Sequence, residues 1–289
     1  MDRAGVTVAI APAPPLVIRA RRGRPSLGLA DLWEYRELFY FLVWRDLKVR
    51  YKQSVFGAGW AVFQPLATMA VFTVVFSRIA GIDSGDVPYP IFCYAALLPW
   101  TFFSRGTADG AASLLGAAAM ISKIYFPRLI VPAAAVLRGL VDAALSAVVF
   151  AGLMVWYRQP PTPALAALPL FVLLAVAATL GTGFWLSALN VRYRDVKYVV
   201  PFFLQLWLFV TPVIYPTARA TELLHSVGLP GWFYGLNPMA GVVEGFRWSL
   251  LGETTSAGVM AASGGVSILL LLVGALYFRR VERTFADVL

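Results

Sequence analysis

Residues 164–189 read ALAALPLFVLLAVAATLGTGFWLSAL, a stretch of 26 positions without one charged side chain. A helix of about 20 apolar residues crosses a hydrocarbon layer about 30 Å thick, so this stretch predicts a membrane-spanning helix. The same criterion finds five more spans, near residues 60–80, 88–107, 129–157, 198–219 and 258–278. The span near 129–157 is long and contains Arg138 and Asp142, so we expect its start to project into the cytoplasm or to tilt.

The composition agrees with an all-α integral membrane protein. Hydrophobic residues make up 60% of the 289 positions and charged residues 13%, whereas soluble domains carry about 25% charged residues. So few charges cannot cover a water-soluble surface, which excludes a soluble enzyme, a disulfide scaffold and a disordered chain. One cysteine and one histidine exclude an intramolecular disulfide and a histidine-based metal cluster. We expect no metal and no cofactor in this chain.

The positive charges predict the orientation in the membrane. The net charge of +9 raises the question of nucleic acid, but the positions of the charges matter more than their sum. With the N-terminus inside, 19 Lys and Arg residues fall in inner segments and 4 in outer segments, leaving out Arg138. Cytoplasmic loops retain such residues. We therefore expect cytoplasmic termini, an even number of crossings and no nucleic-acid partner.

The N-terminal region divides into two parts ahead of the first span. Residues 1–28 are rich in proline and arginine, which predicts a flexible basic cytoplasmic tail, and residues 29–289 form the transmembrane domain. Within residues 30–53, charges recur at helical spacing opposite apolar side chains, and Asp31 with Glu34 resembles a capping box. This pattern predicts a basic amphipathic helix in the membrane interface, with its cations toward anionic head groups.

The segment between the last two spans, residues 216–257, has a different pattern. It is too apolar for an ordinary loop, yet prolines and glycines interrupt it. Trp232 and Trp248 are of the residue type that lies at membrane interfaces. We expect short re-entrant or interfacial helices on the outer side, with the irregular backbone satisfied by protein or water.

Three motifs resemble one family, the ABC-2 type permeases that export bacterial polysaccharides such as O-antigen, capsule and teichoic acid. They are DLKVRYKQSVFGAGWAVFQPL at residues 46–66, NVRYRDVKYVVPFFLQLWLFVTPVIYP at 190–216, and NPMAGVVEGFRWSLLG at 237–252. The likeness extends from about residue 29 to the C-terminus. It implies a homodimer of six-helix subunits in the bacterial inner membrane, which moves a lipid-linked glycan outward with two copies of a cytoplasmic ATPase.

The chain itself carries no phosphate-binding loop of the form G-x-x-x-x-G-K-[ST]. We therefore expect that it is not an ATPase and that the partner binds ATP and Mg²⁺. In the family, a short helix between the second and third spans and the N-terminal amphipathic helix contact the ATPase. The matching candidates for coupling are Lys123, Tyr125, Phe126, Arg128, Arg45 and Lys48. The alternative is that these charges only follow the positive-inside rule.

In the family, the first and fifth helices line the translocation path. Aromatic rings pack against the C–H faces of sugars without fixed hydrogen bonds, which suits a moving polymer. The candidates here are Trp60, Phe63, Phe72, Phe76, Phe202, Phe203, Trp207 and Tyr215, with Phe209 beside them. The alternative is that these rings fill helix contacts or form interfacial belts.

Ionisable residues inside a membrane are informative because they are costly. Arg138 and Asp142 are four residues apart, which predicts a local ion pair, and the alternative is a glycan or pyrophosphate contact by Arg138. Arg105 and Asp109 fit a merely interfacial position. Glu244 and Arg247 lie where the family places an outer gate, and they either pair across it or cap short helices.

Two rival functions remain open from the sequence. One is a membrane enzyme acting on polyprenyl lipids, but such enzymes need convergent catalytic groups and the acidic residues here are mostly scattered singly. The other is an ABC-2 permease that exports a drug or a simple lipid.

Overall fold

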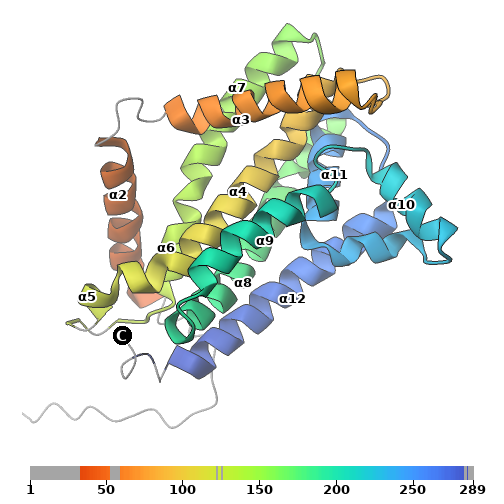
Figure 1. Cartoon of the computed structure of the whole chain (residues 1–289). Helices are drawn as coiled ribbons and strands as arrows, with labels where there is room; N and C mark the ends of the chain where they lie inside the picture. The colour runs from red at the N-terminus through yellow and green to blue at the C-terminus, as the bar shows by residue number, and fades with distance from the viewer. Residues whose placement is uncertain (1–32, 53–58, 122, 125, 283–284, 286–289) are drawn as a thin grey trace, which may run out of the picture.

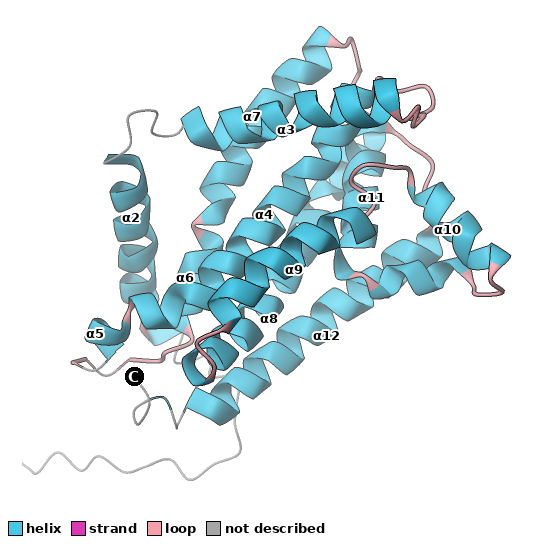
Figure 2. Cartoon of the chain, viewed as in Figure 1, coloured by secondary structure: helices cyan, strands magenta, loops and turns pink. Residues whose placement is uncertain are grey.

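The computed structural model describes residues 33–52, 59–121, 123–124, 126–282 and 285, and every regular element in these ranges is a helix (Figure 2). The predicted tail of residues 1–28 and Asp31 of the predicted capping box lie outside the described residues. The elements are α2 (Arg36–Lys52), α3 (Gly59–Phe72), η1 (Thr73–Ile79), α4 (Tyr89–Gly116), α5 (Ala118–Ile121), α6 (Ile130–Leu137), α7 (Gly139–Trp156), η2 (Pro163–Ala167), α8 (Leu168–Arg192), α9 (Val196–Val210), α10 (Thr217–Ser226), η3 (Gly231–Leu236), α11 (Pro238–Leu251) and α12 (Ala257–Val281). The all-α prediction is confirmed for this part of the chain.

Four helical stretches are long and apolar enough to cross a membrane: Gly59–Ile79, Ile130–Trp156, Pro163–Arg192 and Ala257–Val281. Two further spans were expected, and the helices found there differ from these four. α4 has 28 residues, about 42 Å at 1.5 Å per residue, but it is less apolar than the four. α9 is apolar but has 15 residues and ends at Val210, although its span was expected to reach residue 219. The count of six crossings therefore stays a prediction.

α4 is the central helix of the bundle (Figure 1). The helices α3, α6, α7, α8, α9 and α11 all pack against it. Its residues from Ile91 to Leu98 are buried without interruption. Because α4 faces protein rather than lipid, its lower apolarity is compatible with a position inside the bundle.

α8 and α12 lie side by side along much of their length (Figure 1). A Cβ atom built on Gly274 would lie 2.2 Å from the main-chain oxygen of Gly181. One built on Gly181 would lie 2.4 Å from the carbonyl carbon of Leu270. This close approach requires glycine at both positions, as in other tightly packed membrane helices.

The predicted helix over residues 129–157 is interrupted at Arg138, which separates α6 from α7. α2 lies against α6 at one side of the bundle (Figure 1). Leu42 of α2 is buried there against Ile130 and Ala134. The aromatic side chains that remain exposed here are Tyr40, Phe41 and Trp44 of α2, together with Trp33, which precedes the helix.

The segment over residues 216–257 forms the short helices α10, η3 and α11 at the end of the bundle away from α2 (Figure 1). α10 and η3 pack against each other, and α11 packs against α12, α4 and α8. The sequence predicted short helices here rather than one more span, and the described elements have that form. For orientation, we call this the outer end and the α2 side the inner end, following the positive-inside prediction.

Candidate functional site

Charged side chains meet at the inner end, where α2, α4 and the α6–α7 interruption come together. Arg138 places Nη2 2.7 Å from Oδ2 of Asp109 and Nη1 3.4 Å from Oδ2 of Asp46. Arg50 places Nη1 2.8 Å from Oδ2 of Asp142. We call Asp46, Arg50, Arg105, Asp109, Arg138 and Asp142 the inner charge cluster.

The predicted ion pair between Arg138 and Asp142 is wrong. Arg138 binds the carboxylates of Asp46 and Asp109, while Asp142 binds Arg50 and accepts a hydrogen bond from the hydroxyl of Tyr51. The physical reason is that α2 and α4 bring partners that the spacing within one helix could not indicate. The alternative was that Arg138 contacts a glycan or pyrophosphate. The structure disfavours this contact, because both terminal nitrogens of Arg138 are already paired with carboxylates.

The cluster also reaches α3, the first span. Arg105 of α4 donates a hydrogen bond to the side-chain oxygen of Gln64 on α3. A cavity of about 260 Å³ lies between these helices and is lined by Arg50, Tyr51, Trp60, Ala61, Gln64, Arg105, Ala108, Asp109 and Asp142. Arg105 and Asp109, which the sequence assigned only to the interface, thus connect α2 to a helix expected to line the path.

The predicted path aromatics divide into two groups. Trp60, Phe63, Phe202 and Phe203 are exposed on α3 and α9 in this single chain. Phe72 and Phe76 pack on the core, Trp207 donates its indole N–H to Oδ1 of Asn237 at 3.0 Å, and Tyr215 donates its hydroxyl to the carbonyl of Phe209 at 3.0 Å. The first group has surface to offer to a ligand or a second subunit. The second group holds the helices and the turn after α9 in place.

The predicted coupling residues also differ in accessibility. Lys123 is exposed, whereas Phe126 is 4% exposed and packs in the core of its own chain. Arg128 donates from Nη1 to the carbonyl of Glu282 at 2.7 Å, and Tyr125 lies outside the described residues. On α2, Arg45 is exposed and pairs with Asp46, and the Lys48 ammonium lies 5.4 Å from the ring centre of Trp44. Of the described candidates, Lys123, Arg45 and Lys48 have exposed side chains.

At the outer end, Arg247 on α11 is 2% exposed and is satisfied by main-chain carbonyls. It donates to Phe92 at 3.3 Å, to Tyr215 at 3.3 Å and to Val213 at 2.8 Å. Its guanidinium carbon lies 3.5 Å from the ring centre of Phe92. Arg247 therefore fixes the non-helical turn after α9 to the start of α4.

Glu244, one turn before Arg247, is 5% exposed and binds the start of α12. Its Oε1 accepts a hydrogen bond from the main-chain N–H of Ser256 at 2.7 Å, next to the first residue of α12. Within the described residues Glu244 and Arg247 form no ion pair with each other. Of the two predicted alternatives, Glu244 has the capping arrangement, which the helix dipole favours for an acid.

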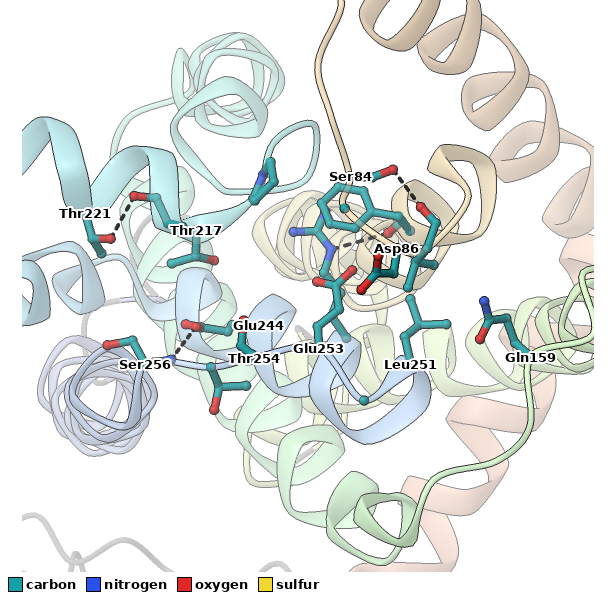
Figure 3. A pocket seen from close by; sticks show the side chains of 18 residues that line it. Ser84, Asp86, Gln159, Thr217, Thr221, Glu244, Leu251, Glu253, Thr254 and Ser256 are labelled. Atoms are coloured by element: carbon teal, nitrogen blue, oxygen red, sulfur yellow. Dashed lines mark hydrogen bonds between the residues drawn. The ribbon is translucent and has the colours of Figure 1, made fainter.

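A cavity of about 660 Å³ opens beside these residues (Figure 3). We call it the outer cavity; its walls come from residues 84–87, from residues 216–218 and 221, from α11, and from residues 251–256. Burial raises the pKa of Glu244 to about 7 and also raises the pKa of Glu253, while Arg247 opposes both shifts. The outer cavity therefore holds acidic groups in a partly enclosed, polar setting.

Sequence reasoning missed Asp46, Arg50 and Glu253. For Glu253 a signal was present in the sequence, because it directly follows the third motif, whose last residue, Gly252, caps α11 with a φ of 75°. For Asp46 and Arg50 the sequence placed the charges on an amphipathic helix but held no sign that α2 faces α6 and α7.

A bundle of long apolar helices around a buried central helix, with a cluster of charges at one end, is the architecture of a multi-pass membrane protein. The chain belongs to the ABC-2 type transporter family, which matches residues 37–251. Members of this family act with a cytoplasmic ABC ATPase and have no ATPase activity of their own.

Curated relatives cover almost the whole chain. The O-antigen export system permease protein RfbA of Myxococcus xanthus is 30% identical over 260 residues, 89% of this chain and 97% of the relative. A protein of the same name from Klebsiella pneumoniae is 26% identical over 254 residues, 88% and 95% of the two chains. The polysialic acid transport protein KpsM of Escherichia coli is 24% identical over 246 residues, 82% and 91% of the two chains.

Proposed function

We propose that the chain is the transmembrane permease subunit of an ATP-driven exporter that moves a lipid-linked polysaccharide, such as O-antigen, across the bacterial inner membrane. The observation that carries the proposal is the near full-length match to relatives whose names describe O-antigen export and polysialic acid transport. No observation favours the alternative, export of a drug or a simple lipid.

The proposed assembly is a homodimer with both termini in the cytoplasm and six crossings in each subunit. The two crossings beyond the four long apolar helices are α4, which neighbouring helices enclose, and α9, which is short but apolar. Two ATPase subunits bind the inner face. The path runs between the subunits, along α3 and α9.

The exposed rings supply the surface chemistry of this path. Trp60, Phe63, Phe202 and Phe203 are each more than half exposed in the single chain. Such rings attract the C–H faces of pyranoses and let hydroxyl groups stay hydrated, so a polymer slides without being held. A second subunit facing these surfaces would enclose them.

ATP-driven movement enters through two inner elements. Lys123 and the exposed cations of α2 supply charge to an ATPase surface, and the inner charge cluster ties α2 to α4 and α7. Through Arg105 and Gln64 the same network reaches α3. A movement of α2 is thereby transmitted to α3, a helix of the proposed path, through paired polar side chains rather than through lipid.

The proposal is tested by deleting the gene in its host and measuring glycan at the cell surface. We expect loss of surface glycan, recovery with the wild-type chain, and co-purification of an ATPase whose ATP hydrolysis responds to the lipid-linked substrate. Normal surface glycan in the deletion strain would contradict the function. Charge reversal of Lys123, Arg45 and Lys48 together should abolish ATPase association, while reversal of the exposed outer residue Arg219 should leave it intact.

Orientation is tested with single cysteines at Lys123 and Thr254 in a background where native Cys93 is fully buried. A membrane-impermeant maleimide added to intact spheroplasts should label the cysteine at position 254 and spare the one at position 123. Labelling of position 123 from outside would overturn both the topology and the proposed ATPase contact.

A further inference from the structure

The outer cavity lies at the outer ends of the two helices proposed to line the path. Residues 84–87 come shortly after η1, which continues α3, and residues 216–221 follow α9 and its turn. α11 and the connection from α11 to α12 complete the wall (Figure 3). The cavity therefore lies at the end of the molecule where, under the proposed function, the polymer leaves the path.

Two carboxylate oxygens in the cavity wall are buried without a hydrogen-bond partner. They are Oε2 of Glu244 and Oε1 of Glu253. In Figure 3 the carboxylate of Glu253 points toward the centre of the cavity, and Glu244 lies beside Ser256. A buried acceptor without a donor is unfavourable, and nearly all such groups in folded proteins are satisfied by protein, water or a ligand.

The nearby arginine does not supply the missing donors. Arg247 directs Nε, Nη1 and Nη2 to the carbonyls of Phe92, Tyr215 and Val213. The wall therefore combines one cation, each of whose three nitrogens donates to a main-chain carbonyl, with the carboxyl groups of Asp86, Glu244 and Glu253. This balance disfavours an anion such as a phosphate or pyrophosphate head group.

The rest of the wall suits a neutral molecule with many hydroxyl groups. Thr217, Thr254 and Ser256 offer hydroxyls, Gln159 offers an amide, and Val87 and Leu251 offer apolar surface. The volume of about 660 Å³ lies in the usual range of small-molecule sites, about 300–1,000 Å³. Among the described residues no cluster of three or more His, Cys, Asp or Glu has the arrangement of a metal site.

We propose that the outer cavity binds sugar hydroxyl groups of the exported glycan as it leaves the path, with Glu244 Oε2 and Glu253 Oε1 accepting from them. This proposal rests on the proposed function. It assigns a polyol-binding site to each subunit, separate from the aromatic surface of α3 and α9.

The experiment uses photo-crosslinking in the host strain that exports the glycan. Benzoylphenylalanine replaces Thr254, which is exposed in the cavity wall, and in a matched control it replaces Leu223, which is 68% exposed on α10 and outside the cavity. After irradiation of cells producing the complete transporter, the permease is purified and its glycan adducts are separated by size. We expect adducts from position 254 and only background from position 223.

The discriminating variants are Glu244→Gln and Glu253→Gln. Glutamine at position 244 can keep its oxygen on the N–H of Ser256 while an NH₂ group replaces the unpartnered acceptor. We expect the double variant to fold, to bind the ATPase and to lower the adduct yield from position 254 by at least about tenfold, because it removes two hydrogen bonds to charged groups and the loss of one already corresponds to about tenfold.

The outcomes separate the site from the function. Surface glycan with equal adducts at positions 254 and 223, or adducts that the double variant leaves unchanged, would overturn the site and leave the proposed function standing. Failure of the wild-type chain to restore surface glycan would remove the function and the site with it. Stabilisation of the purified complex by Ca²⁺ or spermidine, lost in the double variant and without glycan adducts, would replace the sugar site by a cation site.

Discussion

At the inner end of the bundle Arg50 and Arg138 each reach an aspartate, whereas at the outer end Arg247 is engaged with carbonyls and two glutamates keep an unpartnered oxygen. The difference follows from the neighbouring backbone. The turn after α9 has non-helical carbonyls in a buried setting, and these require donors. Arg247 supplies them, so the outer carboxylates remain available to a ligand. The inner carboxylates instead join helices together.

The largest effect is expected from Arg247→Ala. It removes the side-chain donor from three main-chain carbonyls, two of which, those of Val213 and Tyr215, lie in the non-helical turn, and it creates a space beside Phe92. We expect the free energy of unfolding to fall by about 4 kcal/mol, measured by thermal unfolding of the detergent-solubilised chain. Arg219→Ala on the exposed side of α10 is the matched control and should change little. A loss no larger than the control's would mean that carbonyl satisfaction at the outer end is not what Arg247 provides.

The second effect is a pH dependence from Glu244, whose folded-state pKa is raised to about 7. Because this value exceeds the unfolded pKa of about 4.3, the contribution to stability is complete below that lower value and disappears as pH rises through about 7. We expect wild type to lose about 3 kcal/mol more than Glu244→Gln between pH of about 4 and 8. Glu253 shifts in the same direction and Arg247 opposes it, so the comparison with the Gln variant isolates Glu244. If the stability of wild type and of Glu244→Gln changed with pH in the same way, the carboxylate of Glu244 would already be satisfied in the folded chain.

The third effect tests the inner end through Asp142→Asn, which removes the charge that pairs with Arg50. We expect a loss of about 2 kcal/mol in the free energy of unfolding, since the side chain of Asp142 is 10% exposed and that of Arg50 is 37% exposed. Substrate-stimulated ATP hydrolysis should fall while ATPase association is kept. Exchange of the two charges in Arg50→Asp/Asp142→Arg should restore part of both. No rescue by the exchanged pair would mean that the contact between α2 and α7 does not depend on their attraction.

The sequence was sufficient for properties that depend on local pattern. Apolar length predicted the helices around residues 60–80, 129–157, 164–189 and 258–278, and the prolines and glycines of residues 216–257 predicted short helices. The family followed from three motifs and is established by the match over residues 37–251. In each case the information lies within one continuous stretch of chain.

The sequence did not predict which side chains contact each other when they lie on different helices. The spacing of Arg138 and Asp142 favoured a local pair, but partners from α2 and α4 compete more effectively. The same limit applies to the aromatic residues: spacing alone could not separate exposed Phe203 from Trp207, whose indole is committed to Asn237. The oxygens of Glu244 and Glu253 lack a partner because of how α11 and α12 pack, and this packing cannot be predicted from the sequence of one chain.

The smallest effect is expected from Arg45→Ala, at the rim of the inner charge cluster. Its side chain is 45% exposed and pairs with the adjacent Asp46, so solvent screens the interaction and the stability change should stay within about 0.5 kcal/mol. Affinity for the ATPase should nevertheless fall, because an exposed cation on α2 contributes to binding a partner more than to holding this chain together. Lys48 is another exposed cation on α2, so Lys48→Ala should likewise lower the affinity for the ATPase with little change in stability. A stability loss as large as that of Asp142→Asn would place Arg45 inside the cluster and remove it from the ATPase-facing surface.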